Sequence, residues 1–334
     1  MRRLLFLTQA VDPAHPALAA TIAQLRALAS RVDELVVLAQ SAGAAQLPDN
    51  VEVRTFGAST RVGRLARFER ELAGALPADA VVAHMIPVYV VLAAPLVRPR
   101  RIPLLLWYTH WKASAQLRAA ERLATAVVSV DRRSFPFDSA KLQPIGHGID
   151  VSEFRCTERG ARDGLRALVL GRYTPAKGIE TILRAAQQVD GVEVELHGAA
   201  LNELERRHRE ELERLGLPLG DAVPRAEIPG LFARSDVLVN NMEAGAPDKV
   251  VYEAAASCLP VLVSNPVFDG LTDGLGADLM FARDDPAELA ERIGALAALD
   301  TETRAGLGRT LRERVAAGHS VEHWADAVLE VARR

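Results

Sequence analysis

The stretch LVLGRYTPAKG, residues 168–178, runs directly into the helical pattern IETILRAAQQV, residues 179–189. It predicts a buried strand, a loop and a helix, and the loop carries Gly171, Arg172 and Lys177. In parallel sheets, ligands bind beyond the carboxyl ends of strands, where backbone amides at helix starts favour anions. Glycine lets the backbone approach a phosphate, and two cations offset its charge. The stretch therefore predicts a diphosphate site; on spacing alone, two ordinary surface cations are the alternative.

A second segment, DKVVYEAAASCLPVLVSN at residues 248–265, has a helix followed by an apolar strand, with Glu253 inside the helix. A carboxylate there can accept hydrogen bonds from two hydroxyl groups. The alternative is that Glu253 is an exposed helix residue. Together the two segments suggest a nucleotide-sugar site. Neither contains G-x-G-x-x-G or G-x-x-x-x-G-K-[ST], which argues against dinucleotide and Walker-type binding.

Short apolar runs alternate with helical patterns along the whole chain, which is typical of parallel sheets flanked by helices. The sequence therefore predicts an α/β fold with two doubly wound halves. We expect helices near 178–189, 201–215 and 249–257, and only helices after residue 285. The expected strands are 4–8, 34–39, 51–56, 80–85, 103–110 and 126–131 in the first half, and 167–172, 192–198, 236–241, 260–265 and 278–282 in the second.

The length of 334 residues exceeds one ordinary hydrophobic core and suits two domains, with a cleft between them. The boundary is expected at PIGHGIDVSEF, residues 144–154, where Gly146, Gly148 and a proline interrupt the pattern. His147 in this segment is expected to serve only the hinge.

Composition argues against a membrane-spanning chain. Hydrophobic residues make up 49% and charged residues 25%, and no run approaches the roughly eighteen apolar residues that a span needs. The start, MRRLLFLTQAVDPAHP, resembles a signal peptide only up to Gln9, and we expect a first strand there. Cys156 and Cys258 show neither metal spacing nor a disulfide framework, so we expect a reducing cytoplasm.

The charge is divided unevenly along the chain. Residues 1–150 hold 18 Lys or Arg against 12 Asp or Glu, whereas residues 151–334 hold 22 against 31. The basic half contains TRVGRLARFERELAGAL, a helical pattern whose apolar face is expected to hold Leu65, Phe68 and Leu72. Such a helix can rest on anionic lipid at the inner face of the membrane, or be a solvated face interrupted by glutamates. Nucleic acid is not expected, because the basic residues lack interleaved aromatic residues. The basic residues of the helix are Arg61, Arg64, Arg67 and Arg70.

Three segments together resemble the glycosyltransferases of family 4: GRYTPAKGIETILRAA (171–186), DVLVNNMEAGAPDKVVYEAAASCLPVLVSN (236–265) and, before them, PIGHGIDVSEF. The resemblance covers most of the chain and is strongest over residues 144–300. It implies the GT-B fold, in which two Rossmann-like domains face a cleft and C-terminal helices cross back onto the first domain. It also implies an acceptor-binding domain of residues 1–150 with about 320–334, and a donor-binding domain of residues 151–319.

The resemblance assigns the donor diphosphate to Arg172 and Lys177, with Gly171 beside them, and the nucleotide ribose to Glu253. Glu253 matches the second glutamate of the family's E-x7-E motif. The first glutamate, which meets the transferred sugar in the family, is replaced by Gly245. Three nearby side chains remain candidates for the donor: Glu243 or Asp248 in place of that glutamate, and Lys249 as a further phosphate contact.

In the first half, the resemblance favours His110, which follows the run PLLLWYT, as a residue near the transferred sugar or the acceptor. His84 ends another expected strand and is a weaker candidate for the same cleft. Gln9 and Asp12 lie in TQAVDP, where relatives have paired glycines. They can bind an acceptor hydroxyl, and Asp12 can equally cap the next helix.

Such relatives are retaining enzymes that usually bind no metal, and this sequence has no D-x-D motif or His/Cys cluster. The resemblance therefore implies a metal-independent, cofactor-free hexosyltransferase of bacterial polysaccharide or glycoconjugate biosynthesis. A UDP- or GDP-sugar would be the donor, and a glycan, lipid-linked or small-molecule compound the acceptor. Two alternatives remain open: a GT-B nucleotide-sugar epimerase, and a catalytically weakened sugar-nucleotide-binding protein, which the missing first glutamate suggests.

Overall fold

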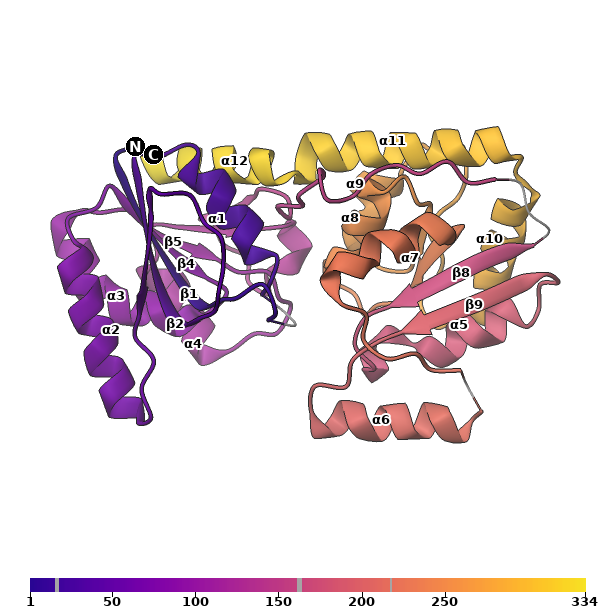
Figure 1. The fold of residues 1–334 in the computed structure, drawn as a ribbon, viewed down its shortest axis with the longest axis horizontal. Helices are drawn as coiled ribbons and strands as arrows, with labels where there is room; N and C mark the ends of the chain where they lie inside the picture. The colour runs from indigo at the N-terminus through magenta and orange to yellow at the C-terminus, as the bar shows by residue number, and fades with distance from the viewer. Residues whose placement is uncertain (16–17, 161–163, 217) are drawn as a thin grey trace. The chain divides into compact units, whose positions relative to one another are not determined.

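The computed structural model of the chain describes residues 1–15, 18–160, 164–216 and 218–334. Its contacts divide the chain into two compact units, each with its own parallel sheet (Figure 1). Unit 1 comprises Met1–Asp150 and Gly318–Arg334, and unit 2 comprises Val151–Ala317. Among the described residues, no helix combines the length and the apolar character that a membrane crossing requires.

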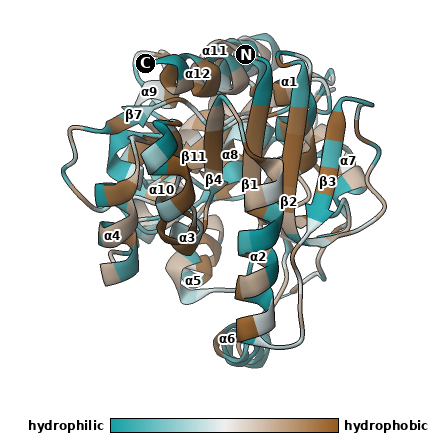
Figure 2. Cartoon of the chain, turned by 90° about the vertical axis from the view of Figure 1, so that its left-hand side faces the viewer, coloured by the Kyte–Doolittle hydropathy of each residue, from teal (hydrophilic) through white to brown (hydrophobic). Residues whose placement is uncertain are grey.

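The sheet of unit 1 has seven strands in the order β3-β2-β1-β4-β5-β6-β7, and its pairs are parallel. Its central strands are apolar on both faces because helices cover both, and Figure 2 shows β1, β2 and β4 brown over most of their length. The strands are β1 (Arg3–Val11), β2 (Glu34–Ala42), β3 (Val51–Thr55), β4 (Ala80–His84), β5 (Leu104–Trp107), β6 (Ala126–Ser129) and β7 (Leu142–Pro144).

The helices of unit 1 pack apolar side chains into the core of this unit, and α1 is buried over almost its whole length. The C-terminal helix belongs to this unit: Trp324 is fully buried and meets Trp107 of β5 edge-to-face, with ring centroids 5.6 Å apart. Arg31, just after α1, forms an ion pair with Asp326 of the same C-terminal helix. The helices are α1 (Thr21–Ala29), α2 (Arg61–Ala75), α3 (Pro87–Val97), α4 (Ala115–Leu123) and α12 (Val321–Arg333).

The sheet of unit 2 has four parallel strands in the order β11-β10-β8-β9. The strand order reverses between β8 and β10, so the carboxyl ends of these two strands form the topological switch point of the sheet. The strands are β8 (Leu165–Leu170), β9 (Val192–His197), β10 (Val237–Asn240) and β11 (Val261–Val263). The helices are α5 (Ile179–Ala186), α6 (Glu203–Arg214), α7 (Ile228–Arg234), α8 (Lys249–Ala256), α9 (Asp269–Thr272), α10 (Pro286–Ala298) and α11 (Thr301–His319), whose last two residues are counted with unit 1.

The expected α/β fold with helices after residue 285 is confirmed, but β4 and β5 end earlier than expected, and three further details of the prediction are wrong. No strand forms at 278–282; only Met280 makes a single bridge to Val263. The three-residue strand β7 was not expected because it is too short to show a period. β1 continues to Val11, so Gln9 lies within a strand and not in the loop after it.

The expectation that the two cysteines form no disulfide framework is also wrong. Cys156 and Cys258 form a disulfide across a sequence separation of 102 residues. The first segment of unit 2 lies against the turn that follows α8, and this tertiary contact has no signature in the spacing of the cysteines.

Candidate functional site

The loop after β8 is shaped around the side chain of Lys177. Gly171 has a backbone φ of +139°, and a Cβ atom at this position would lie 2.5 Å from the Lys177 ammonium nitrogen. Only glycine leaves room for that side chain to fold back toward the strand. The Lys177 Nζ donates a hydrogen bond to the carbonyl of Leu170, the last residue of β8, at 3.0 Å.

The loop after β10 meets this lysine at the switch point. Lys177 is buried, and its Nζ forms an ion pair with Asp248 Oδ2 at 2.5 Å. The same oxygen accepts a hydrogen bond of 2.9 Å from the Asn240 side chain at the end of β10. Asp248 immediately precedes α8. The structure therefore brings together two predicted donor residues that are 71 positions apart.

Arg172 also has a carboxylate partner, which the sequence did not reveal. Its guanidinium pairs with Glu205 of α6, while its side chain remains 52% exposed. Glu205 is buried and also accepts a hydrogen bond of 2.7 Å from the Leu201 amide. Both predicted diphosphate cations thus face a carboxylate of the same unit.

Glu253 is buried in the middle of α8, which rules out the alternative of an exposed helix residue. Its Oε1 accepts a hydrogen bond from Arg225 Nη1 at 2.9 Å, and Arg225 Nη2 pairs with Glu153 at 2.6 Å. Arg225 has no signature in the sequence, because it follows Pro224 in a short 3-10 turn without a motif. Half-buried Lys249 lies one turn before Glu253, and burial lowers its pKa to about 8 against the opposing effect of Glu253.

The segment that departs from the family motif is held by Asn265. Its side-chain oxygen accepts from the Gly245 amide at 3.1 Å, and its side-chain nitrogen donates to the carbonyls of Glu243 and Ala246. Gly245 has a φ of +83°, a conformation that would strain a glutamate at this position. The carboxylate of Glu243 accepts no hydrogen bond from the described residues, whereas that of Asp248 is engaged by Lys177.

In unit 1, the candidate histidines have different surroundings. His84 ends β4, is buried, and its Nδ1 lies 3.1 Å from the hydroxyl of Thr8 on β1. His110 is half-buried in the loop after β5, stacks on Trp111 and accepts a 3.0 Å hydrogen bond from the Lys112 amide. Burial, with a smaller effect of Lys112, lowers the pKa of His110 and favours the neutral ring.

The polar residues near the end of β1 also differ from expectation. Gln9 is exposed on the strand itself. Asp12 accepts a hydrogen bond of 2.9 Å from the Ala14 amide, so it closes a turn of its own. Since α1 begins only at Thr21, the prediction that Asp12 caps this helix is wrong. His147 is buried, and its carbonyl accepts a hydrogen bond from Gln24.

Helix α2 carries the predicted basic residues, and its apolar side chains differ in exposure. Phe68 and Leu72 are buried, whereas Leu65 is 42% exposed. Val62 is 79% exposed on the same helix. Arg67 donates to the carbonyl of Gly57, and Arg70 pairs with its neighbour Glu71.

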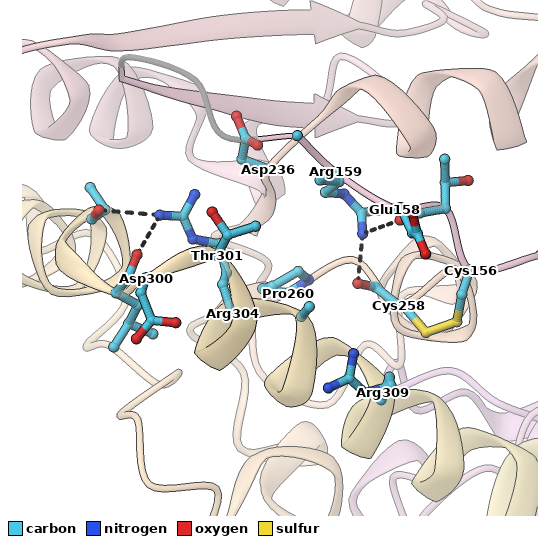
Figure 3. A pocket seen from close by; sticks show the side chains of 15 residues that line it. Cys156, Glu158, Arg159, Asp236, Cys258, Pro260, Asp300, Thr301, Arg304 and Arg309 are labelled. Carbon is cyan, nitrogen blue, oxygen red and sulfur yellow. Dashed lines mark hydrogen bonds between the residues drawn. A yellow bond between two sulfur atoms is a disulfide. The ribbon is translucent and has the colours of Figure 1, made fainter.

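A cavity of about 480 Å³ lies at the amino ends of the unit 2 strands, opposite the carboxyl ends that form the switch point (Figure 3). Asp236 and Pro260, which line it, immediately precede β10 and β11, so it adjoins the amino ends of the strands. None of the predicted donor residues lines it. This cavity is therefore separate from the switch point.

Comparison with known proteins agrees with this architecture. Residues 172–330 match the family described as "Glycosyl transferase-like". No curated protein matches the chain by sequence. Among solved structures, HepE from Anabaena in complex with UDP and glucose has 20% identity and a TM-score of 0.78, with both chains covered completely.

Two further structures share the fold at similarly low identity. Sucrose-phosphate synthase from Thermosynechococcus elongatus has 15% identity and a TM-score of 0.79, covering 100% of this chain and 98% of its own. WaaG, a glycosyltransferase involved in lipopolysaccharide biosynthesis, has 15% identity and a TM-score of 0.69, covering 98% and 99%. The whole chain therefore has the GT-B fold of these structures, and its residues 172–330 are similar to the glycosyltransferase family.

Proposed function

We propose that the protein is a retaining glycosyltransferase that moves a hexose from a UDP- or GDP-sugar to a glycan, lipid-linked or small-molecule acceptor. One observation carries the proposal most directly: the loop with Arg172 and Lys177 and the start of α8 meet at the switch point of the unit 2 sheet. Ligands of parallel sheets bind at this place. HepE, which has the same fold, has been crystallised with UDP and with UDP-glucose.

The charges at this site suit a departing nucleoside diphosphate. Cleavage of the bond between sugar and phosphate creates an oxocarbenium-like carbon and adds negative charge to the leaving group. Cations that gain interaction energy as this charge develops stabilise the transition state more than the ground state. We assign this role to Arg172 and Lys177, with Lys249 as a further phosphate contact, and no metal ion is required.

The ribose is assigned to Glu253. Its Oε1 is held by Arg225, and its Oε2 accepts no hydrogen bond from the described residues. A fixed carboxylate with one oxygen available is suited to accept hydrogen bonds from a ribose diol. The transferred sugar is assigned to the segment from Glu243 to Asp248, where Glu243 is the candidate with an unengaged carboxylate.

The reaction proposed is attack on the same face that the diphosphate leaves. The acceptor oxygen bonds to the anomeric carbon, the electron pair of the breaking bond leaves with the diphosphate, and a phosphate oxygen takes the acceptor's proton. The acceptor is assigned to unit 1, through His110 together with His84, Gln9 and Asp12. The lowered pKa of His110 leaves its ring neutral near pH 7, and because its Nδ1 accepts from the Lys112 amide, its Nε2–H can donate a hydrogen bond to a sugar hydroxyl.

Peripheral contact with anionic lipid through α2 is part of the same proposal. The exposed side chains of Val62 and Leu65 lie between arginines on this helix. Apolar side chains flanked by basic ones favour binding at the surface of an anionic bilayer.

The experiment that tests the function offers UDP- and GDP-sugars, with and without candidate acceptors, and follows sugar transfer, donor hydrolysis and the melting temperature. We expect transfer with one donor and a rise in melting temperature with the matching nucleotide. Conversion of the donor sugar without any acceptor would instead identify an epimerase. Nucleotide binding without turnover would identify a binding protein, and no binding of either nucleotide would refute a donor site.

A further inference from the structure

Glu253 is held in place by a chain of contacts that leaves its own helix. Arg225, in a short 3-10 turn before α7, donates from Nη1 to Glu253 and from Nη2 to Glu153. Its guanidinium also lies over the ring of Phe154, 5.5 Å from the ring centroid. An arginine that bridges two carboxylates restrains the position of both.

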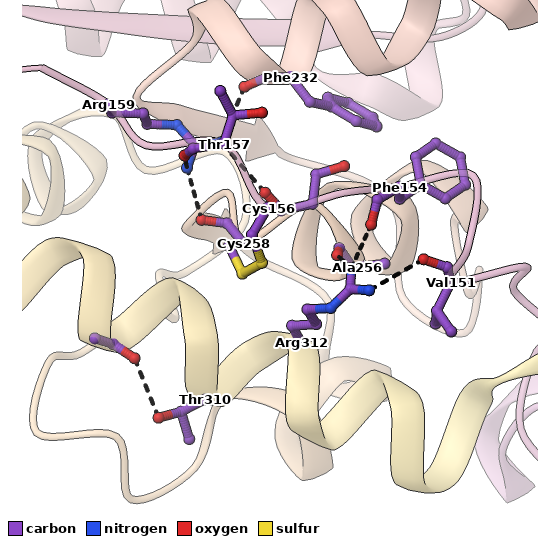
Figure 4. Close-up of a disulfide and its surroundings, with 12 residues drawn as sticks. Val151, Phe154, Cys156, Thr157, Arg159, Phe232, Ala256, Cys258, Thr310 and Arg312 are labelled. Atoms are coloured by element: carbon purple, nitrogen blue, oxygen red, sulfur yellow. Dashed lines mark hydrogen bonds between the residues drawn. A yellow bond between two sulfur atoms is a disulfide. The ribbon is translucent and has the colours of Figure 1, made fainter.

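Glu153 and Phe154 belong to a segment without regular structure, which needs tertiary contacts to hold its position. Three connections fasten this segment to the end of α8 and its surroundings (Figure 4). Arg312 donates hydrogen bonds to the carbonyls of Phe154 and of Ala256, the last residue of α8. Arg159 donates to the carbonyls of Phe232, Ser235 and Cys258.

The third connection is covalent. Cys156 lies three residues after Glu153, and its partner Cys258 lies five residues after Glu253. The disulfide and the Arg225 bridge therefore close one ring, from Glu253 through Arg225 and Glu153 to Cys156, and through Cys258 back to α8. All members of this ring belong to unit 2.

We propose that Arg225 is a positioning residue that orients Glu253 toward the donor ribose, and that the Cys156–Cys258 disulfide makes this orientation sensitive to redox state. The inference rests on the proposed function, since it takes a nucleotide as the ligand of Glu253. A dithiol reductant breaks the sulfur–sulfur bond and supplies two electrons and two protons. Both cysteines become thiols, and the dithiol closes its own disulfide. The disulfide then no longer fastens the segment of Glu153 to the end of α8, and the restraint on Glu253 weakens.

The test compares the affinity for a nucleoside diphosphate with that for its 2′,3′-dideoxy counterpart, which lacks the hydroxyls that Glu253 would bind. UDP and GDP are both titrated by calorimetry, and the tighter one is paired with its dideoxy form. We expect oxidised wild type to prefer the hydroxylated nucleotide by about tenfold or more, as for hydrogen bonds to a charged group. The preference should fall to about threefold or less in Arg225→Gln and in wild type reduced by dithiothreitol.

Two controls separate this role from general destabilisation. Arg234→Gln removes an arginine of neighbouring α7, which pairs with Glu195, and should leave the preference unchanged. Arg225→Lys keeps the charge and should restore part of the preference for the hydroxylated nucleotide. It also replaces Arg225→Gln in the test if that variant does not fold. Cys156→Ser should show the reduced preference with and without dithiothreitol.

The outcomes distinguish the inference from the function on which it rests. If neither UDP nor GDP binds the oxidised wild type, the proposed function fails. If wild type binds but Arg225→Gln keeps the preference for the ribose hydroxyls, Arg225 has no positioning role. A preference that survives reduction, with both thiols titrated, would overturn the redox role, and equal affinity of wild type for the two nucleotides would overturn the inference as a whole.

Discussion

Lys177 and Asp248 form a largely buried ion pair, with 2.5 Å between Nζ and Oδ2, at the switch point of the unit 2 sheet. The pair joins the loop that the sequence marks as a phosphate site to the residue before α8. A diphosphate that binds Lys177 must therefore compete with a carboxylate of the protein itself. The carboxylate of Asp248 stabilises the charged form of Lys177 and opposes the binding of an anionic ligand.

The substitution Asp248→Asn should have opposite effects on stability and on nucleotide affinity. Removing the carboxylate leaves a buried ammonium without its counter-ion, so we expect the free energy of unfolding to fall by about 2 kcal/mol. A bound diphosphate then supplies the missing negative charge, and we expect UDP or GDP to bind about tenfold more tightly. Denaturant unfolding and calorimetry measure the two effects.

The matched control is Glu291→Gln, which removes the same charge from an exposed position on α10 of the same unit. It should change neither quantity appreciably. If Asp248→Asn weakens the binding of UDP or GDP without an attached sugar, Asp248 does not compete with the diphosphate for Lys177. If it weakens only the binding of the sugar nucleotide, Asp248 contacts the transferred sugar.

Removing a diphosphate cation should lower the rate of transfer more than it lowers ground-state binding. We expect Lys177→Met to cost about 3 kcal/mol of transition-state stabilisation, roughly a hundredfold in kcat/KM, as for the loss of one electrostatic stabiliser. Steady-state kinetics with the active donor measures this loss. An unchanged kcat/KM would remove Lys177 from the mechanism.

The fold was predictable because strong local patterns determine it. The apolar runs VVAHM and LLLW predicted where β4 and β5 lie in the chain. Both strands end earlier than expected, at His84 and Trp107. Strand ends depend on where the backbone leaves the sheet, and composition does not report that. The strand predicted at 278–282 does not form. The segment is apolar enough for a strand, but it makes only one bridge, at Met280.

The candidate site was predictable only in part, for a related reason. Glycines and cations in one loop identified Gly171, Arg172 and Lys177, and helix position identified Glu253. The partners Glu205 and Arg225 have no local signature, because they come from other loops and helices and meet these residues only in the folded chain. The disulfide was missed for the same reason.

Lys249 should make nucleotide binding depend on pH near 8. Burial lowers its pKa from 10.5 to about 8 in the folded protein. Between these values the unfolded chain carries more protons, so this group alone makes stability rise with pH across the window. A bound phosphate favours the charged ammonium, and we therefore expect affinity for UDP or GDP to weaken several-fold from pH 7 to pH 9.

Calorimetry of Lys249→Met and of wild type over this range measures the effect. The variant should lose the pH dependence while keeping a weaker, constant affinity. Parallel curves for the two proteins would assign the pH dependence to another group.

Helix α2 should bind anionic vesicles in a salt-dependent manner. Val62 and Leu65 offer exposed apolar surface, and Arg61 and Arg64 lie beside them. We expect the protein to sediment with phosphatidylserine vesicles at low salt and to be released at high salt, because salt screens surface charges. Val62→Ser with Arg64→Gln should reduce binding at least several-fold, and Arg118→Gln on α4 is the control. Wild type that ignores these vesicles would show that α2 is a solvated helix.

The central claim is that a nucleoside diphosphate binds at the switch point of unit 2, and a crystal structure with UDP or GDP tests it most directly. We expect the diphosphate within hydrogen-bond distance of Arg172 and Lys177, with Asp248 displaced from the lysine and Glu253 accepting hydrogen bonds from the ribose hydroxyls. A nucleotide bound elsewhere, for example in the cavity beside Asp236 and Pro260, would contradict it.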